Sequence, residues 1–292
     1  MRALLAPQLE AHGAAYTPVA RLAGAVLVAA SRSSPVVVLL AVLWSTDPPV
    51  TPQLLACMVL ALTILPAALA LLLRRASAAR IDVDREQLTI RRSHLQIDVP
   101  CGAVERVRPW AVPLPGPGFS LSLRSGRRLS YGVQIDDPRS FLLAMAERAG
   151  SAPAHAALAH PVLVWAHTRA AHEEGLRPRW QRWAAKFPLF GLLPTAVLFN
   201  AHQHIAYGGL RGQCYLEGLV PYLSAFGVYW GTTTIYLVLY ASVLRAVAEA
   251  LALATTAVAP ARAAGVRRTV EIAGRVLYFG GVPALLALRF LA

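Results

Sequence analysis

The stretch PQLLACMVLALTILPAALALLLRRASAARIDVDREQLTIRRSHLQIDV, residues 52–99, decides the fold, because two structural patterns meet inside it. Up to Leu73 it is an apolar block, and about 20 such residues are enough to cross a bilayer as a helix. From Ile81 onward apolar and polar residues alternate, which is typical of half-buried strands. Between the two patterns lie Arg74, Arg75 and Arg80, as expected at the cytoplasmic end of a membrane span. The sequence therefore predicts a membrane helix that leads directly into a cytoplasmic β-sheet.

The composition of the whole chain favours a membrane protein. Of its 292 residues 56% are apolar and 15% are charged, and the mean hydropathy is +0.50. A soluble domain carries about 25% charged residues, so a nucleic-acid-binding protein is not expected despite the net charge of +13. Lys186 is the one lysine among 28 basic residues, which favours a GC-rich bacterial genome. We therefore expect a multi-pass protein of the bacterial inner (cytoplasmic) membrane.

Five apolar segments are predicted to cross this membrane. The first, residues 22–44, has Arg32 near its middle and leaves two interpretations open. Either it is one span with Arg32 turned toward a partner, or residues 22–30 lie at the interface and Ser34-Pro35 begins a short inserted helix. The other four predicted spans are residues 52–73 with a kink at Pro66, residues 187–207, residues 219–244 with a helical continuation to 258, and residues 276–292, starting at 276 or nearer Ile272.

The distribution of basic residues orients the spans. The loop between the first two spans has no Lys or Arg, whereas residues 74–186 contain 18 of the 28 basic residues. By the positive-inside rule the N-terminus and residues 74–186 are cytoplasmic, while the loops near residues 48 and 212 and the C-terminus are outside. The apolar run after Arg2 is too short for a signal peptide, so the N-terminus is expected to be retained. Four parts are predicted, namely a two-helix membrane hairpin (1–75), a cytoplasmic domain (76–150), a helical connector (151–186) and a three-helix membrane region (187–292).

The cytoplasmic domain is predicted to be an α+β, antiparallel-sheet-plus-helix insert. Alternation gives strands at 81–83, 88–90, 95–99, 119–123 and 129–133, with a further strand near 104–107. Ser125-Gly126 is expected to form a hairpin turn, and the proline-rich segment 109–118 a surface loop or edge. Asp137 is expected to cap a closing helix with an apolar face of Phe141, Leu142 and Met145. The three cysteines fall in different predicted regions, so no disulfide is expected.

This segment resembles the bacterial pleckstrin-homology-like domains that are attached to membrane spans. The resemblance implies a binding or self-association module without catalytic activity, and phosphoinositide recognition is not carried over. It covers residues 80–150 and rests on a short strand with Asp84, on Leu88-Thr89-Ile90, on a strand ending at Val99-Pro100, on a hydrophobic strand ending at Gly126-Arg127-Arg128, and on the closing helix.

Two sets of residues are candidate sites. The first could bind anionic lipid or a partner, at about 1 kcal/mol for each charge, or could be a solvated face that follows the positive-inside rule. It comprises Arg91, Arg92, Arg106, Arg108, Arg124, Arg127 and Arg128. The second could line a polar cavity, or could be the polar end of one helix and the packing stripe of the next. It comprises Asn200, His202, His204, Tyr229, Thr233, Tyr236 and Tyr240.

Neither set predicts a metal or a cofactor. Two imidazoles spaced like His202 and His204 are a weak signal for a metal site, and His155, His160, His167 and His172 do not share one helical face. The favoured function is therefore a non-enzymatic scaffold or regulatory accessory protein that binds a protein partner, membrane lipids or its own copy. The alternative is a small membrane enzyme or transporter that uses the polar cavity.

Overall fold

The computed structural model describes residues 9–45, 50–84, 86–93, 95–175 and 183–291. The chain forms two compact units. The first unit contains residues 1–31, 65–176 and 250–266, and the second contains residues 32–64, 177–249 and 267–292. Each unit is therefore assembled from segments that are far apart in the sequence.

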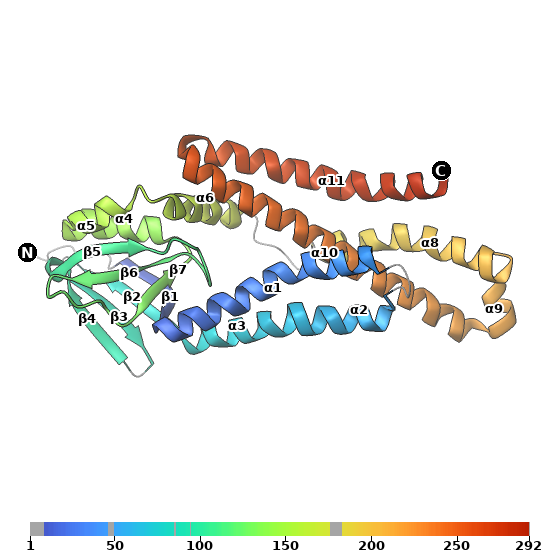
Figure 1. The fold of residues 1–292 in the computed structure, drawn as a ribbon, viewed down its shortest axis with the longest axis horizontal. Coiled ribbons are helices and arrows are strands. Elements are labelled where there is room, and N and C mark those ends of the chain that lie inside the picture. The colour runs from blue at the N-terminus through green and yellow to red at the C-terminus, as the bar shows by residue number, and fades with distance from the viewer. Residues whose placement is uncertain (1–8, 46–49, 85, 94, 176–182, 292) are drawn as a thin grey trace, which may run out of the picture. The chain divides into compact units, whose positions relative to one another are not determined.

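The first unit is built on an antiparallel sheet of seven strands, in the order β4-β3-β2-β1-β7-β6-β5 (Figure 1). The strands are β1 (Leu9–Tyr16), β2 (Ala78–Val83), β3 (Gln87–Arg92), β4 (Leu95–Pro100), β5 (Val104–Pro109), β6 (Gly118–Leu123) and β7 (Gly132–Ile135). Predicted strands are thus present at 81–83, 88–90, 95–99, 104–107 and 119–123. The strand expected at 129–133 is shifted toward its C-terminal end.

The middle of this sheet is a strand that the sequence did not predict. β1 pairs with β2 on one side and with β7 on the other, although its residues had been assigned to the membrane hairpin. A β-carbon at Gly13 would lie 2.2 Å from the carbonyl oxygen of Gln134, so the close approach of β1 to β7 requires glycine. The sheet domain is therefore discontinuous, with residues 17–77 inserted between β1 and β2.

One face of the sheet forms the main hydrophobic core. The helices α4 (Pro138–Ala149), α5 (Ala152–Ala157) and α6 (Pro161–Gly175) follow β7 and add side chains to this core. As predicted, Asp137 caps α4, and Phe141 is buried, stacked against Phe119 at 6.1 Å between ring centroids. Ile90 and Leu121 are fully buried in the same cluster.

As expected, the proline-rich segment 109–118 leaves the edge strand β5 and forms an irregular connection to β6, but part of it is packed. Trp110 is only 3% exposed, and its indole N–H donates to the Ser120 hydroxyl at 3.1 Å. The guanidinium carbon of Arg21, on α1 (Pro18–Trp44), lies 4.1 Å from the Trp110 ring centroid. A β-carbon at Gly24 would be 3.3 Å from Pro115. Trp110 and Pro115 of this segment therefore pack against the beginning of α1.

Among the described residues, four helices are long and apolar enough to cross a membrane, namely Pro18–Val42, Pro52–Ala76, Leu219–Val258 and Pro260–Leu288. α1 runs unbroken past Arg32 and Pro35, so the first predicted span is one helix and not an interfacial segment followed by a short helix. The second combines α2 (Pro52–Val59), a π-helical turn η1 (Leu60–Ile64) and α3 (Leu65–Ala76). Pro66 has no N–H to donate into the preceding turn, which accounts for the distortion just before it.

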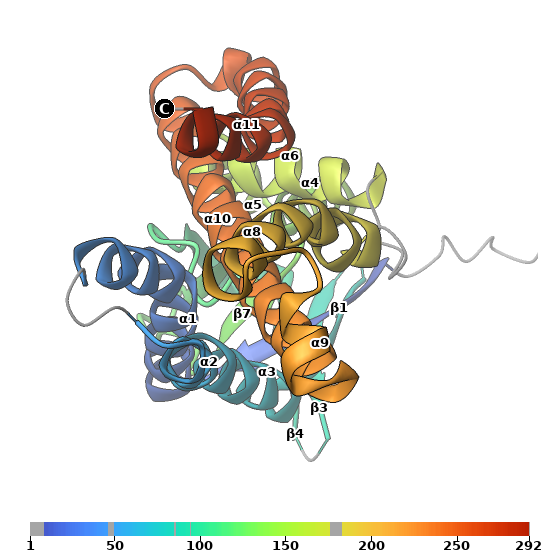
Figure 2. The same ribbon diagram turned by 90° about the vertical axis from the view of Figure 1, so that its right-hand side faces the viewer.

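The chain after residue 183 forms η3 (Ala185–Leu189), α8 (Phe190–Tyr207), α9 (Gly212–Glu217), α10 (Leu219–Val258), η4 (Pro260–Arg262) and α11 (Ala263–Leu291). Figure 2 shows the short α9 between α8 and α10. The predicted span 187–207 is helical but is not among the four apolar helices, because its C-terminal part carries Asn200, His202, Gln203 and His204. α11 begins well before the predicted residue 276.

α8 lies antiparallel along the apolar part of α10. At the middle of α8, the Phe199 ring centroid is 5.1 Å from that of Tyr222 and 5.3 Å from that of Phe226. Near its N-terminal end, the Trp230 indole N–H donates to the Pro188 carbonyl oxygen at 2.8 Å. The two helices therefore remain side by side over most of the length of α8.

Candidate functional site

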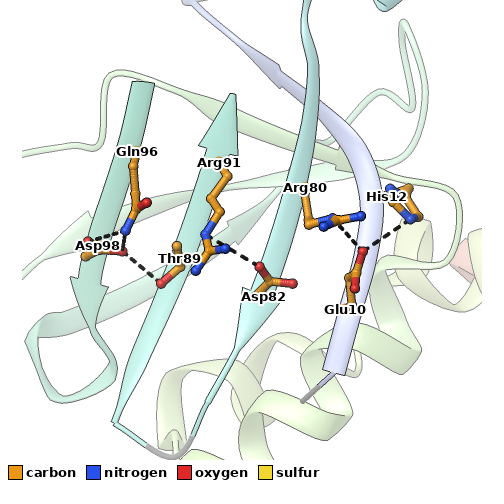
Figure 3. Close-up of polar contacts among 8 residues, drawn as sticks. All are labelled: Glu10, His12, Arg80, Asp82, Thr89, Arg91, Gln96 and Asp98. Atoms are coloured by element: carbon orange, nitrogen blue, oxygen red, sulfur yellow. Dashed lines mark hydrogen bonds and ion pairs between the residues drawn. The ribbon is translucent and has the colours of Figure 1, made fainter. Parts of the chain in front are cut away.

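The outer face of strands β1 to β4 carries two parallel rows of polar side chains (Figure 3). Residues directly opposite each other on neighbouring strands share a face of the sheet, so the register defines each row. The basic row consists of His12, Arg80, Arg91 and Gln96. The acidic row consists of Glu10, Asp82, Thr89 and Asp98. Both rows lie on the side of the sheet opposite to the hydrophobic core.

The two rows contact each other diagonally. The Arg80 Nε is bonded to a carboxylate oxygen of Glu10, and the Arg91 Nε lies 4.0 Å from the Asp82 Oδ2. Asp98 accepts hydrogen bonds from the Gln96 amide at 2.9 Å and from the Thr89 hydroxyl at 2.8 Å. These two hydrogen bonds and the charge of Arg91 lower the pKa of Asp98. The contacts of Asp98 thus favour its ionised form.

Directly across the strands, like charges face each other. Arg80 is opposite Arg91, and Glu10 is opposite Asp82. Like charges at directly opposite positions destabilise a sheet, whereas opposite charges there stabilise it. An arrangement selected only for the stability of the sheet would alternate the charges across each pair of strands. The separation into a basic and an acidic row is therefore not explained by direct cross-strand pairing.

The basic row lies nearer to α1 and α3 than the acidic row. Thr17 alone separates β1 from α1, and Ser77 alone separates α3 from β2. At about 3.3 Å per residue, His12 and Arg80 are about 7 Å from the Ala14–Ala78 pair that ends the β1–β2 ladder, and the acidic row is about 14 Å from it. The face is therefore joined by very short connections to two helices that are long and apolar enough to cross a membrane.

The predicted arginine surface falls into two groups. Arg91 and Arg92 lie on β3, and the Arg92 guanidinium donates to the Ala76 carbonyl oxygen at 2.7 Å. The others lie on or next to β5 and β6, which are separated from β3 by at least three strands, β2, β1 and β7, in the order of the sheet. This second group consists of Arg106, Arg108, Arg124, Arg127 and Arg128, all exposed. Only the first group borders the two rows.

The candidate cavity residues of the membrane region point to different neighbours. Asn200 and His204 are exposed, and the His204 Nδ1 lies 3.0 Å from the Asn200 carbonyl oxygen within α8. The His202 ring lies 5.4 Å from that of Tyr229. Tyr236 packs beside Val38, Leu55 and Leu239, Tyr240 stacks on Tyr278 at 6.3 Å, and Thr233 is half-buried. The stripe on α10 thus packs against several helices.

A buried glutamine pair next to His202 went unnoticed in the sequence. The Gln203 side-chain amide donates to Gln213 at 2.8 Å, and the Gln213 amide donates to Glu217 at 2.9 Å. The Tyr207 hydroxyl donates to the same carboxylate at 3.2 Å. These hydrogen bonds join α8 to α9. The two glutamine side chains therefore stabilise the turn between these helices. The sequence signal that could have revealed this pair is Gln203, a polar residue within an apolar segment.

The histidines of the connector have structural contacts. The His167 Nδ1 lies 3.0 Å from the Asp137 Oδ2, so α6 is joined to the N-cap of α4. The His160 Nδ1 accepts from the Val162 N–H at 3.3 Å, and burial lowers the pKa of His160. His155 lies on α5, and the side chain of His172 is outside the described part of the chain.

Two further observations bear on function. Within the described residues, no three side chains of His, Cys, Asp or Glu lie close enough together to hold a metal ion, and the three cysteines are free thiols. Comparison of the chain with protein-family models, curated proteins and solved structures finds no match. The resemblance to pleckstrin-homology-like domains stays a prediction, and the site has to be interpreted from its own geometry.

Proposed function

We propose that the chain is an integral membrane scaffold or regulatory protein whose sheet binds a protein partner through the basic and acidic rows. The observation that carries the proposal is the placement of like charges directly opposite each other, Arg80 with Arg91 and Glu10 with Asp82. A matching partner places acidic groups over the basic row and basic groups over the acidic row. Such electrostatic complementarity selects partners and fixes the register of binding.

The anchoring of the face supports this function. Four helices of the chain are long and apolar enough to span a membrane, and two of them lead into the central strands of the sheet. We place the N-terminus and the sheet on the cytoplasmic side of a bacterial inner membrane, because basic residues are dense after Leu73. A pleckstrin-homology-like module in this position would serve to hold a partner close to the membrane surface.

Site-specific photo-crosslinking in the native membrane tests this proposal. A photo-reactive amino acid replaces Ser93, which is exposed between β3 and β4 next to the basic row. We expect a discrete adduct that disappears when Arg80→Glu and Arg91→Glu are combined, since the basic row then repels its partner. The adduct should survive the matched reversal Arg127→Glu with Arg128→Glu near the opposite edge of the sheet.

Three outcomes would count against the proposal. One is the absence of any adduct from Ser93, and a second is an adduct that is equally strong in both charge-reversal variants. The third is an adduct that forms as readily from a probe at Ser125, in the turn after β6, because contact there would not involve the two rows. An adduct with twice the mass of the chain would identify the partner as a second copy.

A further inference from the structure

Three helical segments of the second unit meet in a layer of aromatic side chains. Tyr278 on α11 is buried at its centre, and its ring centroid lies 6.1 Å from Phe187, 5.5 Å from Phe190 and 6.3 Å from Tyr240. The Tyr278 hydroxyl donates to the Lys186 carbonyl oxygen at 2.9 Å. We call Phe187, Phe190, Tyr240, Tyr278 and Phe279 the aromatic layer. It joins the start of α8 to the middle of α10 and α11.

One basic side chain from each segment lies just beyond this layer, on the same side. α8 and α11 both run antiparallel to α10. Residues that precede the layer on α8 and α11 therefore lie on the same side of it as residues that follow the layer on α10. Lys186 precedes the layer, Arg275 is one turn before Tyr278, and Arg245 follows Leu244, which packs against the layer. At 1.5 Å per residue all three lie within about 8 Å of the layer along the helix axes.

The three side chains, here called the cationic trio, are exposed. The Lys186 Nζ is 5.1 Å from the Phe187 ring centroid and 5.0 Å from that of Tyr278. Partial burial lowers the pKa of Lys186, and the charges of Arg245 and Arg275 lower it further. A compact positive charge from three segments thus borders an aromatic surface.

Two acidic residues of this region bind Arg267. Glu249 accepts from the Arg267 guanidinium at 2.7 Å, and Glu271 accepts from it at 3.2 Å. Lys186 and the segments 245–249 and 267–275 together hold five basic and two acidic residues, a net charge of +3. The region therefore keeps an excess of positive charge where the helices change from polar to apolar sequence.

We propose that the cationic trio binds the phosphate headgroup of an anionic phospholipid, whose acyl chains lie against the exposed part of the aromatic layer at Phe279. Basic groups between membrane helices bind such headgroups, and aromatic side chains favour the same depth of the bilayer. The exposed Trp183, whose ring lies 5.5 Å from that of Phe187, extends this surface. The proposal requires membrane insertion but does not depend on the partner proposed for the sheet.

Lipid retention by the full-length protein tests the site. The protein is purified in detergent, supplied with equal amounts of phosphatidylglycerol and phosphatidylcholine, and analysed by native mass spectrometry. We expect selective retention of phosphatidylglycerol, and about 100-fold weaker binding when Lys186→Gln, Arg245→Gln and Arg275→Gln are combined, about fivefold for each charge. Lys186→Arg with Arg245→Lys and Arg275→Lys keeps the three charges and should keep the lipid.

The matched control removes three exposed charges from the sheet, by Arg124→Gln, Arg127→Gln and Arg128→Gln, and should leave retention unchanged. If this control loses the lipid while the trio variant retains it, the lipid binds to the sheet and not to the cationic trio. Equal retention of both lipids by the parent protein would remove the proposal altogether. Displacement of phosphatidylglycerol by an equal concentration of inorganic phosphate would identify a general anion site in place of a lipid site.

Discussion

Gly13 lies where the backbone of β1 comes closest to β7. A β-carbon there would be 2.2 Å from the Gln134 carbonyl oxygen, so the strands would have to separate to admit it. We expect Gly13→Ala to destabilise the sheet by about 1–3 kcal/mol, as overpacking does elsewhere. Hydrogen–deuterium exchange of the full-length protein should show faster exchange in β1 and β7. Gly102→Ala is the control, because a β-carbon at Gly102 meets nothing within 4 Å. Unchanged exchange in β1 and β7 of Gly13→Ala would contradict the expected strain.

Asp137 connects the beginning of α4 to His167. Burial raises the pKa of Asp137, but hydrogen bonds from Ser140 and the contact with His167 outweigh it and lower the pKa. A carboxyl group with a lowered native pKa adds stability above its unfolded pKa of about 3.9, and this stability is lost as the pH falls through the native value.

Asp137→Asn keeps a capping side chain without the charge. We expect a loss of about 1 kcal/mol at pH 7 that shrinks below about pH 4. Thermal unfolding of both proteins from pH 7 to pH 2 measures this difference in stability. A difference that does not change with pH would contradict a stabilising role for the negative charge of Asp137.

The pairing of α10 with α11 depends on Arg267, which is 7% exposed and binds Glu249 and Glu271. Removing one partner of a buried ion pair leaves the other charge uncompensated, which costs about 3–5 kcal/mol. We expect Arg267→Ala to lower the thermal unfolding midpoint of the detergent-solubilised protein clearly more than Arg268→Ala. Arg268 is adjacent and exposed, so it controls for the loss of a positive charge. Similar midpoints for the two variants would show that the ion pairs do not hold the helices together.

The elements that the sequence predicted are those with local signals. Alternation at 81–83 and 119–123 and the Asp137 cap each specify structure within a few residues. β1 lacks such a signal, because Ala11, Gly13 and Ala15 are small and its partners are strands far along the chain. The rows of the candidate site depend on that pairing, so they could not be predicted before β1 was placed. The division of the arginines into two groups also depends on the order of the strands, which places β3, with Arg91, far from β5, with Arg106.

For the whole molecule, the number of membrane crossings depends on α8. Its hydropathy is lowered by the polar residues 200–204, and four other helices qualify by length and composition. Nevertheless α8 lies antiparallel along the apolar part of α10, with contacts at its middle and near its N-terminal end. If α10 crosses the membrane there, α8 occupies the same depth and crosses with it. We therefore expect five crossings, with α9 on the outer side and the sheet inside.

Cysteine labelling in intact cells tests this arrangement. Native Cys101 is a poor reporter because it is only 6% exposed, so its protection would reflect burial in the sheet. Single cysteines are better placed at Tyr215, which is 82% exposed on α9, and at Ser125, in the exposed turn after β6, with the native cysteines replaced.

A membrane-impermeant thiol reagent should label Tyr215→Cys and leave Ser125→Cys unlabelled until the cells are permeabilised. Protection of both positions in intact cells would mean that α8 does not cross, because α9 would then lie on the same side as the sheet. Labelling of Ser125→Cys without permeabilisation would reverse the orientation that the arginines after Leu73 predict.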